Sequence, residues 1–248
     1  MDTSKDILTD VEISSNAVNF IFAGYETSKL LMSYTTHMLI HHPDIQDKVR
    51  EEILTVVGDK KEISYDDLKE FHLMDRVLSE TLRLHPPTLT GGDYEMKRKG
   101  VCSSITRASD EDFEVLGKTI PKEVGVMVPL GVLHLSSKYW KEPLVFDPDR
   151  FSPDQKVDPL VYMPFGAGPR FCIGKKMALT VTKLALARLL RRYRVLPGPH
   201  TDKVSAVRAR GPRCCGPRFS PDQKVDPLVY MPFGAGPRFC IGKKIALR

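Results

Sequence analysis

A duplicated segment constrains the organisation of this chain more than any other sequence feature. Residues 150–176 recur without change as residues 218–244. Structural repeats normally diverge, and repeat folds need at least about three copies to bury a continuous core. Two identical copies with unrelated sequence between them indicate a recent duplication or a misassembled gene product. We therefore expect residues 1–202 to contain the folded part, 203–217 to be a linker, and 218–248 to be no independent domain.

Composition excludes several classes of protein. The chain has 248 residues, of which 42% are hydrophobic and 27% charged, as in ordinary globular proteins. No apolar run approaches the roughly 18 residues of a membrane-spanning helix, and the N-terminus has no secretory signal. We therefore expect no membrane anchor in this chain. The five cysteines lack paired spacing, which argues against a disulfide framework and favours a reducing compartment.

Hydrophobic periodicity predicts a mainly α-helical fold with a minor antiparallel β part. Pro43 ends the first periodic segment, Gly58 the second, and Pro86 the third. Short β-rich runs and glycine-rich or aperiodic stretches lie between the later helices. The expected helices are 9–42, 43–57, 74–84 and 173–193, the expected strands are 113–115, 124–129 and 131–133, and the expected loops are 90–104 and 162–174.

The motif with the clearest chemistry surrounds one cysteine. Glycines allow backbone N–H groups to turn inward around a sulfur, and the start of a following helix favours negative charge. Both effects stabilise a thiolate, which is a soft ligand suited to iron. Pro169 has no backbone N–H, which excludes a dinucleotide-binding loop that would need an amide there. The simpler alternative to an iron ligand is a buried structural cysteine. The motif comprises Phe165, Gly166, Gly168, Arg170, Cys172 and Gly174.

This motif resembles the haem-binding signature of the cytochromes P-450, the haem-thiolate monooxygenases. Three further segments resemble the same family in the expected order: Ala23–Ser28 (AGYETS), Glu80–Arg83 (ETLR) and Phe146–Phe151 (FDPDRF). The similarity extends over about residues 10–202. The motif sequences are most similar to those of the microsomal branch of drug-metabolising and thromboxane-synthase-like enzymes. The resemblance implies the C-terminal half of the family's fold, without the first half, and therefore an incomplete haem domain.

The resemblance also assigns roles to individual residues. Cys172 would be the axial ligand of haem b, an iron protoporphyrin, with the other motif residues around it. Arg170 and Arg107 would bind the haem propionates, and Arg150 would complete a buried network with Glu80 and Arg83. Cys240, the counterpart of Cys172 in the second copy, would be unused.

A segment of the first helix would lie beside the haem. Ala23 and Gly24 would contact the cofactor, and Glu26 and Thr27 would act in catalysis by transferring protons. Gly24 costs a helix about 1 kcal/mol relative to alanine, which indicates a kink or a close approach at this position. Alternatively, Thr27 simply donates a hydrogen bond to the carbonyl one turn earlier.

The resemblance implies a monooxygenase that inserts one oxygen atom of O2 into an apolar small molecule or lipid. An NADPH-dependent reductase would supply electrons through a basic proximal face, on the cytosolic side of the endoplasmic reticulum membrane. Two alternatives stay open: a non-catalytic truncated haem-binding fragment or misassembled product, and an isomerase of thromboxane-synthase type. The arginines at 188, 191, 192 and 194 lack interleaved aromatics, so we expect a solvated helix face and no nucleic-acid binding.

Overall fold

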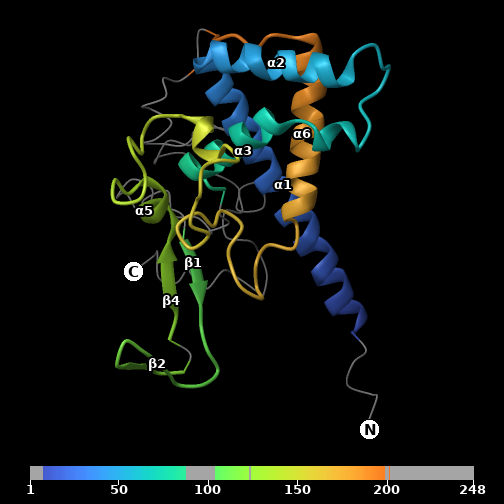
Figure 1. The fold of residues 1–248 in the computed structure, drawn as a ribbon. Helices are drawn as coiled ribbons and strands as arrows, with labels where there is room; N and C mark the ends of the chain where they lie inside the picture. The colour runs from blue at the N-terminus through green and yellow to red at the C-terminus, as the bar shows by residue number, and fades with distance from the viewer. Residues whose placement is uncertain (1–7, 88–103, 123, 199–200, 202–248) are drawn as a thin grey trace, which may run out of the picture. The chain divides into compact units, whose positions relative to one another are not determined.

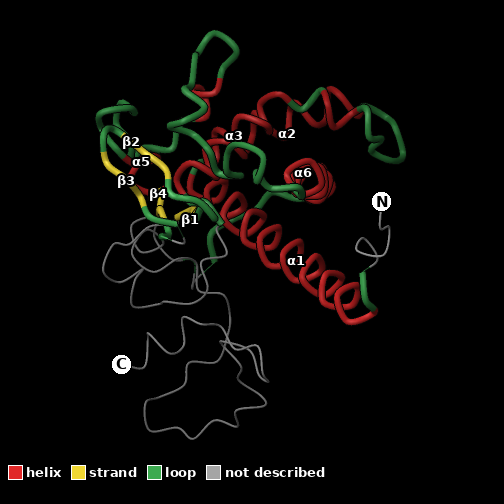
Figure 2. The backbone as a smooth tube through the Cα atoms, turned by 90° about the horizontal axis from the view of Figure 1, so that it is seen from below, coloured by secondary structure: helices red, strands yellow, loops and turns green. Residues whose placement is uncertain are grey.

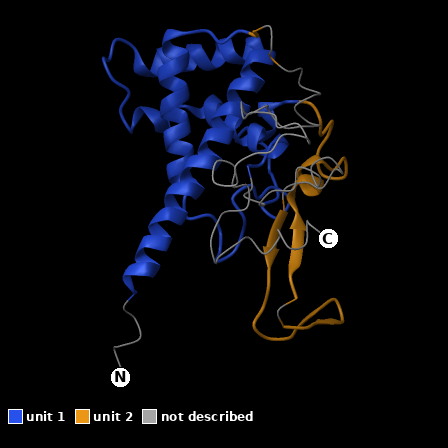
Figure 3. Cartoon of the chain, turned by 180° about the vertical axis from the view of Figure 1, so that it is seen from behind, with its two compact units in different colours: residues 1–87, 146–196 blue, residues 88–145, 197–248 orange. Residues whose placement is uncertain are grey.

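The computed structural model describes residues 8–87, 104–122, 124–198 and 201. The chain divides into two compact units, residues 1–87 with 146–196 and residues 88–145 with 197–248 (Figure 3). The first unit is helical and the second holds all of the described strands. This arrangement confirms the predicted mainly helical class with a minor antiparallel β part. The predicted linker and the duplicate lie outside the described residues.

The first helix, α1 (Asp10–His41), is the longest element (Figure 1). Thr9 Oγ1 accepts a hydrogen bond from the Glu12 N–H, and the Glu12 carboxylate accepts one from the Thr9 N–H. This reciprocal cap satisfies donors that a helix start leaves unpaired. The next helix, α2 (Pro43–Val57), begins at Pro43, whose fixed φ suits the first helical position. Both helices confirm the predicted boundaries to within one residue.

The two halves of α1 have different surroundings. Its C-terminal half carries buried side chains, including Leu31, Met38 and Leu39. Its N-terminal half exposes large apolar side chains to solvent, such as Phe20, Ile21 and Phe22, which are 60–72% exposed. Only the C-terminal half of α1 therefore contributes to the core.

The core of the helical unit forms where α1, α2, α3 (His72–Leu84) and α6 (Lys175–Arg192) contact one another. Figure 2 views α6 nearly end-on beside α1. Burying each large aliphatic side chain contributes about 1.5–3 kcal/mol. Two short 3-10 helices, η2 (Asp67–Lys69) and η3 (Pro148–Phe151), complete the unit. The fully or almost fully buried residues include Val49, Ile53, Phe71, Met74, Val77, Leu78, Leu186, Ala187 and Leu190.

Helix α3 begins two residues before its predicted start at residue 74. The carboxylate of Glu52, on α2, accepts hydrogen bonds from the backbone N–H groups of Leu73 (2.6 Å) and Met74 (3.1 Å). A carboxylate at a helix start pairs its unsatisfied donors and complements the helix dipole. The cap of α3 therefore comes from a different helix.

In its described residues, the second unit contains two antiparallel strand pairs and one short helix. Strand β1 (Ser104–Arg107) pairs with β4 (Val126–Pro129), and β2 (Phe113–Val115) pairs with β3 (Lys118–Ile120). The loop between β2 and β3 has positive φ at Leu116 and Gly117, as two-residue hairpins require. Trp140 Nε1 donates a hydrogen bond to the carbonyl of Leu133 (3.0 Å).

Two predictions for the second unit are wrong. Residues 131–133, expected as a strand, lie in helix α5 (Leu130–Leu135). A run this short has no periodicity that separates a strand from a buried helix. Ser104, expected in the loop 90–104, begins β1, while residues 90–103 lie outside the described part of the chain. Strands β1 and β3 were not predicted.

Candidate functional site

The loop that carries the cysteine motif folds back on itself. The Cys172 N–H donates to the Phe165 carbonyl (2.8 Å), and the Gly166 N–H donates to the Met163 carbonyl (2.9 Å). Gly166 and Gly168 have φ angles of 78° and 74°, in the left-handed region that favours glycine. Residues 162–174 contain no helix or strand, which confirms the predicted loop. The loop's turns thus require the two glycines of the motif.

Cys172 lies beside the start of a helix. Its thiol is free and exposed to solvent. Gly174 is the N-cap of α6, which begins at Lys175, and the Lys175 N–H lies 3.3 Å from the Cys172 carbonyl. The positive end of a helix dipole stabilises a nearby anion by about 0.3–1 kcal/mol. The loop therefore presents the Cys172 sulfur to solvent, three residues before α6 begins.

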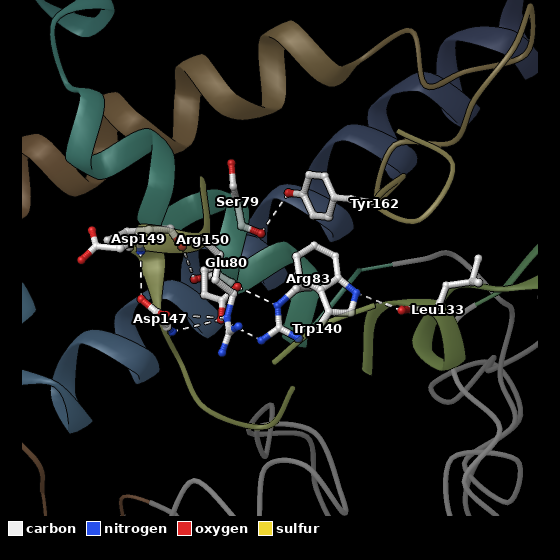
Figure 4. Close-up of polar contacts among 11 residues, drawn as sticks. Ser79, Glu80, Arg83, Leu133, Trp140, Asp147, Asp149, Arg150 and Tyr162 are labelled. Carbon is white, nitrogen blue, oxygen red and sulfur yellow. Dashed lines mark hydrogen bonds and ion pairs between the residues drawn. The ribbon is translucent and has the colours of Figure 1, made fainter. Parts of the chain in front are cut away.

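Glu80 and Arg83 form a buried ion pair on α3 (Figure 4). The Arg83 Nε atom lies 2.7 Å from Glu80 Oε2, and Arg83 Nη2 lies 2.7 Å from Glu80 Oε1. Arg150 Nε lies 3.5 Å from Glu80 Oε1, and the Asp147 N–H donates to the same oxygen at 3.0 Å. The structure therefore brings together the three residues of the expected network, with both side chains of the helix pair fully buried.

Burial governs the electrostatics of this network. Loss of solvent raises the pKa of Glu80, although Arg83, the Asp147 N–H and Arg150 act in the opposite direction. Removing one partner of a buried pair leaves an uncompensated charge, at a cost of about 3–5 kcal/mol. An exposed pair at the same i, i+3 spacing would contribute only about 0.2–0.5 kcal/mol.

Other contacts of the motif around Arg150 were not predicted. Arg76 Nη1 donates to Asp149 Oδ1 (2.7 Å) and to Ser152 Oγ (2.9 Å), which ties α3 to η3. The side chain of Asp147 accepts a hydrogen bond from the Asp149 N–H (3.1 Å) and caps η3. The sequence signal that could have predicted the start of η3 is the pair of aspartates on either side of Pro148, because aspartate is a typical N-cap residue.

The predicted catalytic residues lie on α1, each with a local partner. Thr27 Oγ1 donates to the Ala23 carbonyl (2.7 Å), as the simpler alternative expected. Glu26 pairs with Lys29 (2.8 Å). A Cβ added at Gly24 would have no described atom within 4 Å, apart from the backbone of its own helix. No other described part of the chain therefore approaches α1 closely at Gly24.

The two arginines expected at the haem propionates lie in different units. Arg170 is exposed and belongs to the cysteine loop of the helical unit. Arg107 is exposed on β1, and its Nη1 donates to the Thr106 carbonyl (2.9 Å). Their roles toward a propionate stay predictions. Cys240 lies outside the described residues.

The arginines at the end of α6 are only partly a solvated face, which corrects the prediction. Arg191 Nη2 donates to the carbonyls of Gly58 (3.1 Å) and Lys60 (2.6 Å). Arg194 forms an ion pair with Asp47. These contacts fasten the end of α6 to α2 and the loop after it, while Arg188 and Arg192 are exposed.

Comparison with protein families matches residues 1–209 and 217–248 to the family Cytochrome P450. The chain belongs to the cytochrome P450 family. The matched ranges include both copies of the repeated segment.

Individual cytochromes P450 are similar over most of this chain. Cytochrome P450 3A14 of Cavia porcellus is 44% identical over 201 residues, which cover 80% of this chain and 37% of the relative. Cytochrome P450 3A7 of Homo sapiens is 42% identical over 206 residues, covering 82% and 38%. Cytochrome P450 3A11 of Mus musculus is 40% identical over 201 residues, covering 80% and 37%. The aligned part thus spans little more than a third of each relative's length.

The family implies a haem with a thiolate ligand, and the residues of the helical unit fit such a group. Cys172 offers an exposed sulfur in a glycine-rich turn, and a Cβ added at Gly174 would lie 3.8 Å from that sulfur, in ordinary contact. The exposed guanidinium of Arg170 suits the haem carboxylates.

Among the described helices, none is both long enough and apolar enough to cross a bilayer.

Proposed function

We propose that this chain forms the thiolate-bearing part of a cytochrome P450 monooxygenase, with Cys172 as the axial ligand of haem b. One observation carries the proposal. An exposed cysteine stands at the start of α6, and the segment leading to it contacts the buried Glu80–Arg83 pair through Arg150. A surface cysteine without a ligand would need no such buried support.

The residues around Cys172 present its sulfur at the start of a helix. The turn built by Gly166 and Gly168 brings the Cys172 N–H to the Phe165 carbonyl, and the start of α6 stabilises negative charge. When bound, the haem supplies the activation of O2 that the side chains cannot perform. We assign Arg170 to the propionates, because charge-assisted hydrogen bonds to carboxylates suit arginine.

Residues of α1 handle protons in this proposal. The Thr27 hydroxyl donates its hydrogen to the Ala23 carbonyl, which leaves oxygen lone pairs to accept a hydrogen bond from water or substrate. Glu26 holds a carboxylate one residue away, paired with Lys29 on the same helix. A rotation that separates the Glu26–Lys29 pair would release this acid for proton transfer. Ala23 and Gly24 offer a backbone surface that a flat ligand can approach.

The proposal extends to partners and place. Exposed Lys175 and Lys176 lie in the sequence between exposed Ile173 and Met177, a combination that suits an acidic, partly apolar docking surface. We assign this face to an NADPH-dependent reductase, and the substrate to apolar small molecules or lipids. The corresponding location is the cytosolic face of the endoplasmic reticulum membrane.

The test is spectroscopic. The 248-residue chain, expressed with haem and reduced under carbon monoxide, should give the red-shifted absorption typical of thiolate ligation, with one haem per chain. An imidazole-type spectrum, or no haem uptake, would refute the assignment of Cys172.

A non-catalytic haem-binding fragment is the second candidate. The observation that favours it is the exposed apolar half of α1, together with the exposed thiol of Cys172. Activated oxygen requires a site that excludes water. If this candidate holds, the haem-loaded chain with a reductase will consume NADPH and release peroxide without oxidising an apolar test substrate. Formation of oxidised product in proportion to NADPH would reject it.

A further inference from the structure

Tyr162 joins the cysteine loop to the helix that carries the buried ion pair. Its Oη donates a hydrogen bond to the Ser79 carbonyl (2.9 Å; Figure 4). That carbonyl belongs to the peptide bond that continues into Glu80. In an α-helix it also accepts the N–H four residues later, which is that of Arg83. The phenol therefore contacts α3 at the turn that holds both members of the pair.

Two backbone hydrogen bonds order the chain between Tyr162 and the cysteine. Next to Tyr162, the carbonyl of Met163 accepts from the Gly166 N–H (2.9 Å). Between those two residues, the carbonyl of Phe165 accepts from the Cys172 N–H (2.8 Å). A displacement at Tyr162 would therefore disturb the loop that these two hydrogen bonds close on Cys172. On its C-terminal side, the Cys172 carbonyl accepts a hydrogen bond from the N–H of Lys175, the first residue of α6 (3.3 Å).

The surroundings of Tyr162 keep its hydroxyl a donor. Burial raises the pKa of Tyr162, and the nearby Glu80 carboxylate acts in the same direction, so the phenol is neutral at all ordinary pH values. The Tyr162 ring also packs on the ring of Phe151, with centroids 4.7 Å apart and planes inclined at 54°. Phe151 ends η3 directly after Arg150. The ring and the hydroxyl therefore have separate partners.

We propose that the Tyr162 hydroxyl is a positioning group for the thiolate ligand: its bond to Ser79 fixes the cysteine loop on α3 and so holds Cys172 at the haem. This inference rests on the proposed function. The ring contact with Phe151 stabilises the fold, whereas the hydroxyl sets the place of the loop. Tyr162→Phe separates the two, because it keeps the ring and removes only the donor.

The duplicated segment supplies a matched control. Tyr230 stands in the second copy where Tyr162 stands in the first. In the haem-loaded full chain, Tyr162→Phe should speed the conversion of the reduced carbon-monoxide complex from the thiolate type to the neutral-thiol type by about two- to tenfold, the range of one lost hydrogen bond. Tyr230→Phe should leave that rate unchanged. An unchanged rate in Tyr162→Phe, or an equal change in both variants, would overturn the inference.

Hydrogen exchange measured by mass spectrometry provides a readout that needs no haem. Proteolytic fragments that extend from the loop through Met177 identify the first copy, because the second copy has Ile245 there. Tyr162→Phe should speed exchange in these fragments about two- to tenfold, with α2 unaffected. Equal acceleration in α2 would show that the hydroxyl serves the whole fold, and would reject a positioning role. A wild-type chain without a thiolate spectrum refutes the proposed function, whereas the exchange result still decides whether Tyr162 holds the loop.

Discussion

Replacing Glu80 by glutamine should destabilise the helical unit more than any single change at an exposed ion pair. Both side chains of the Glu80–Arg83 pair are fully buried, with two contacts of 2.7 Å between them. Glu80→Gln removes the negative charge and leaves the Arg83 guanidinium buried without a counter-ion. The expected cost is about 3–5 kcal/mol, a large share of the 5–15 kcal/mol that typically separates folded from unfolded domains.

Urea denaturation followed by far-ultraviolet circular dichroism measures this cost. The midpoint should fall by about 1–3 M for Glu80→Gln. The matched control is Asp66→Asn, which breaks the exposed i, i+3 pair with Lys69 and should cost less than about 1 kcal/mol. A double variant, Glu80→Leu with Arg83→Met, leaves neither member charged and should recover part of the loss. A cost below about 1 kcal/mol for Glu80→Gln would refute the argument that burial makes this pair structural.

Three further outcomes are expected. Hydrogen bonds from Lys60 and Ser64 lower the pKa of Asp67 from 3.8 to about 2, so its stabilising contribution is complete above pH 3.8 and is lost as pH falls toward 2. The difference in unfolding free energy between wild type and Asp67→Asn should therefore be constant near neutral pH and shrink below about pH 4. Gln46→Ala should cost roughly 1–3 kcal/mol in thermal unfolding, since buried Gln46 exchanges two hydrogen bonds with the backbone of Val195. Thr27→Ala should retain haem and stability but release more peroxide per NADPH consumed, measured with a reductase. An unchanged ratio of peroxide released to NADPH consumed in the full-length protein would show that Thr27 takes no part in proton transfer.

Local signals were sufficient for the long helices. Pro43 and Gly58 mark helix ends that the structure reproduces, because proline and glycine act through their own backbone geometry. The start of α3 could not be predicted in the same way. Its cap is Glu52, which lies 21 residues from the N–H of Leu73 that it accepts. A cap provided by another helix has no local sequence signature.

The candidate site shows the same division. The glycine turn around Cys172 follows from local conformational needs, and the spacing of Glu80 and Arg83 predicts that they can pair. Neither feature shows which pairs are buried, since exposed Asp66 and Lys69 have the same spacing. Burial depends on how α3 packs with distant segments. The Tyr162–Ser79 contact was missed for that reason, because it spans 83 residues.

The most direct test of the account compares two cysteines in identical sequence surroundings. Cys172 stands just before α6, and Arg150 of the same copy contacts buried Glu80. Arg218, the counterpart of Arg150, follows Gly-Pro in place of Asp-Pro-Asp. The first copy therefore has the support that we assign to the ligand loop. In the haem-loaded chain, Cys172→Ser should abolish the thiolate-type spectrum of the reduced carbon-monoxide complex, and Cys240→Ser should leave it intact, with one haem per chain by pyridine haemochrome assay. Loss of that spectrum in Cys240→Ser with its retention in Cys172→Ser, or two haems per chain, would contradict the assignment of Cys172 as the ligand.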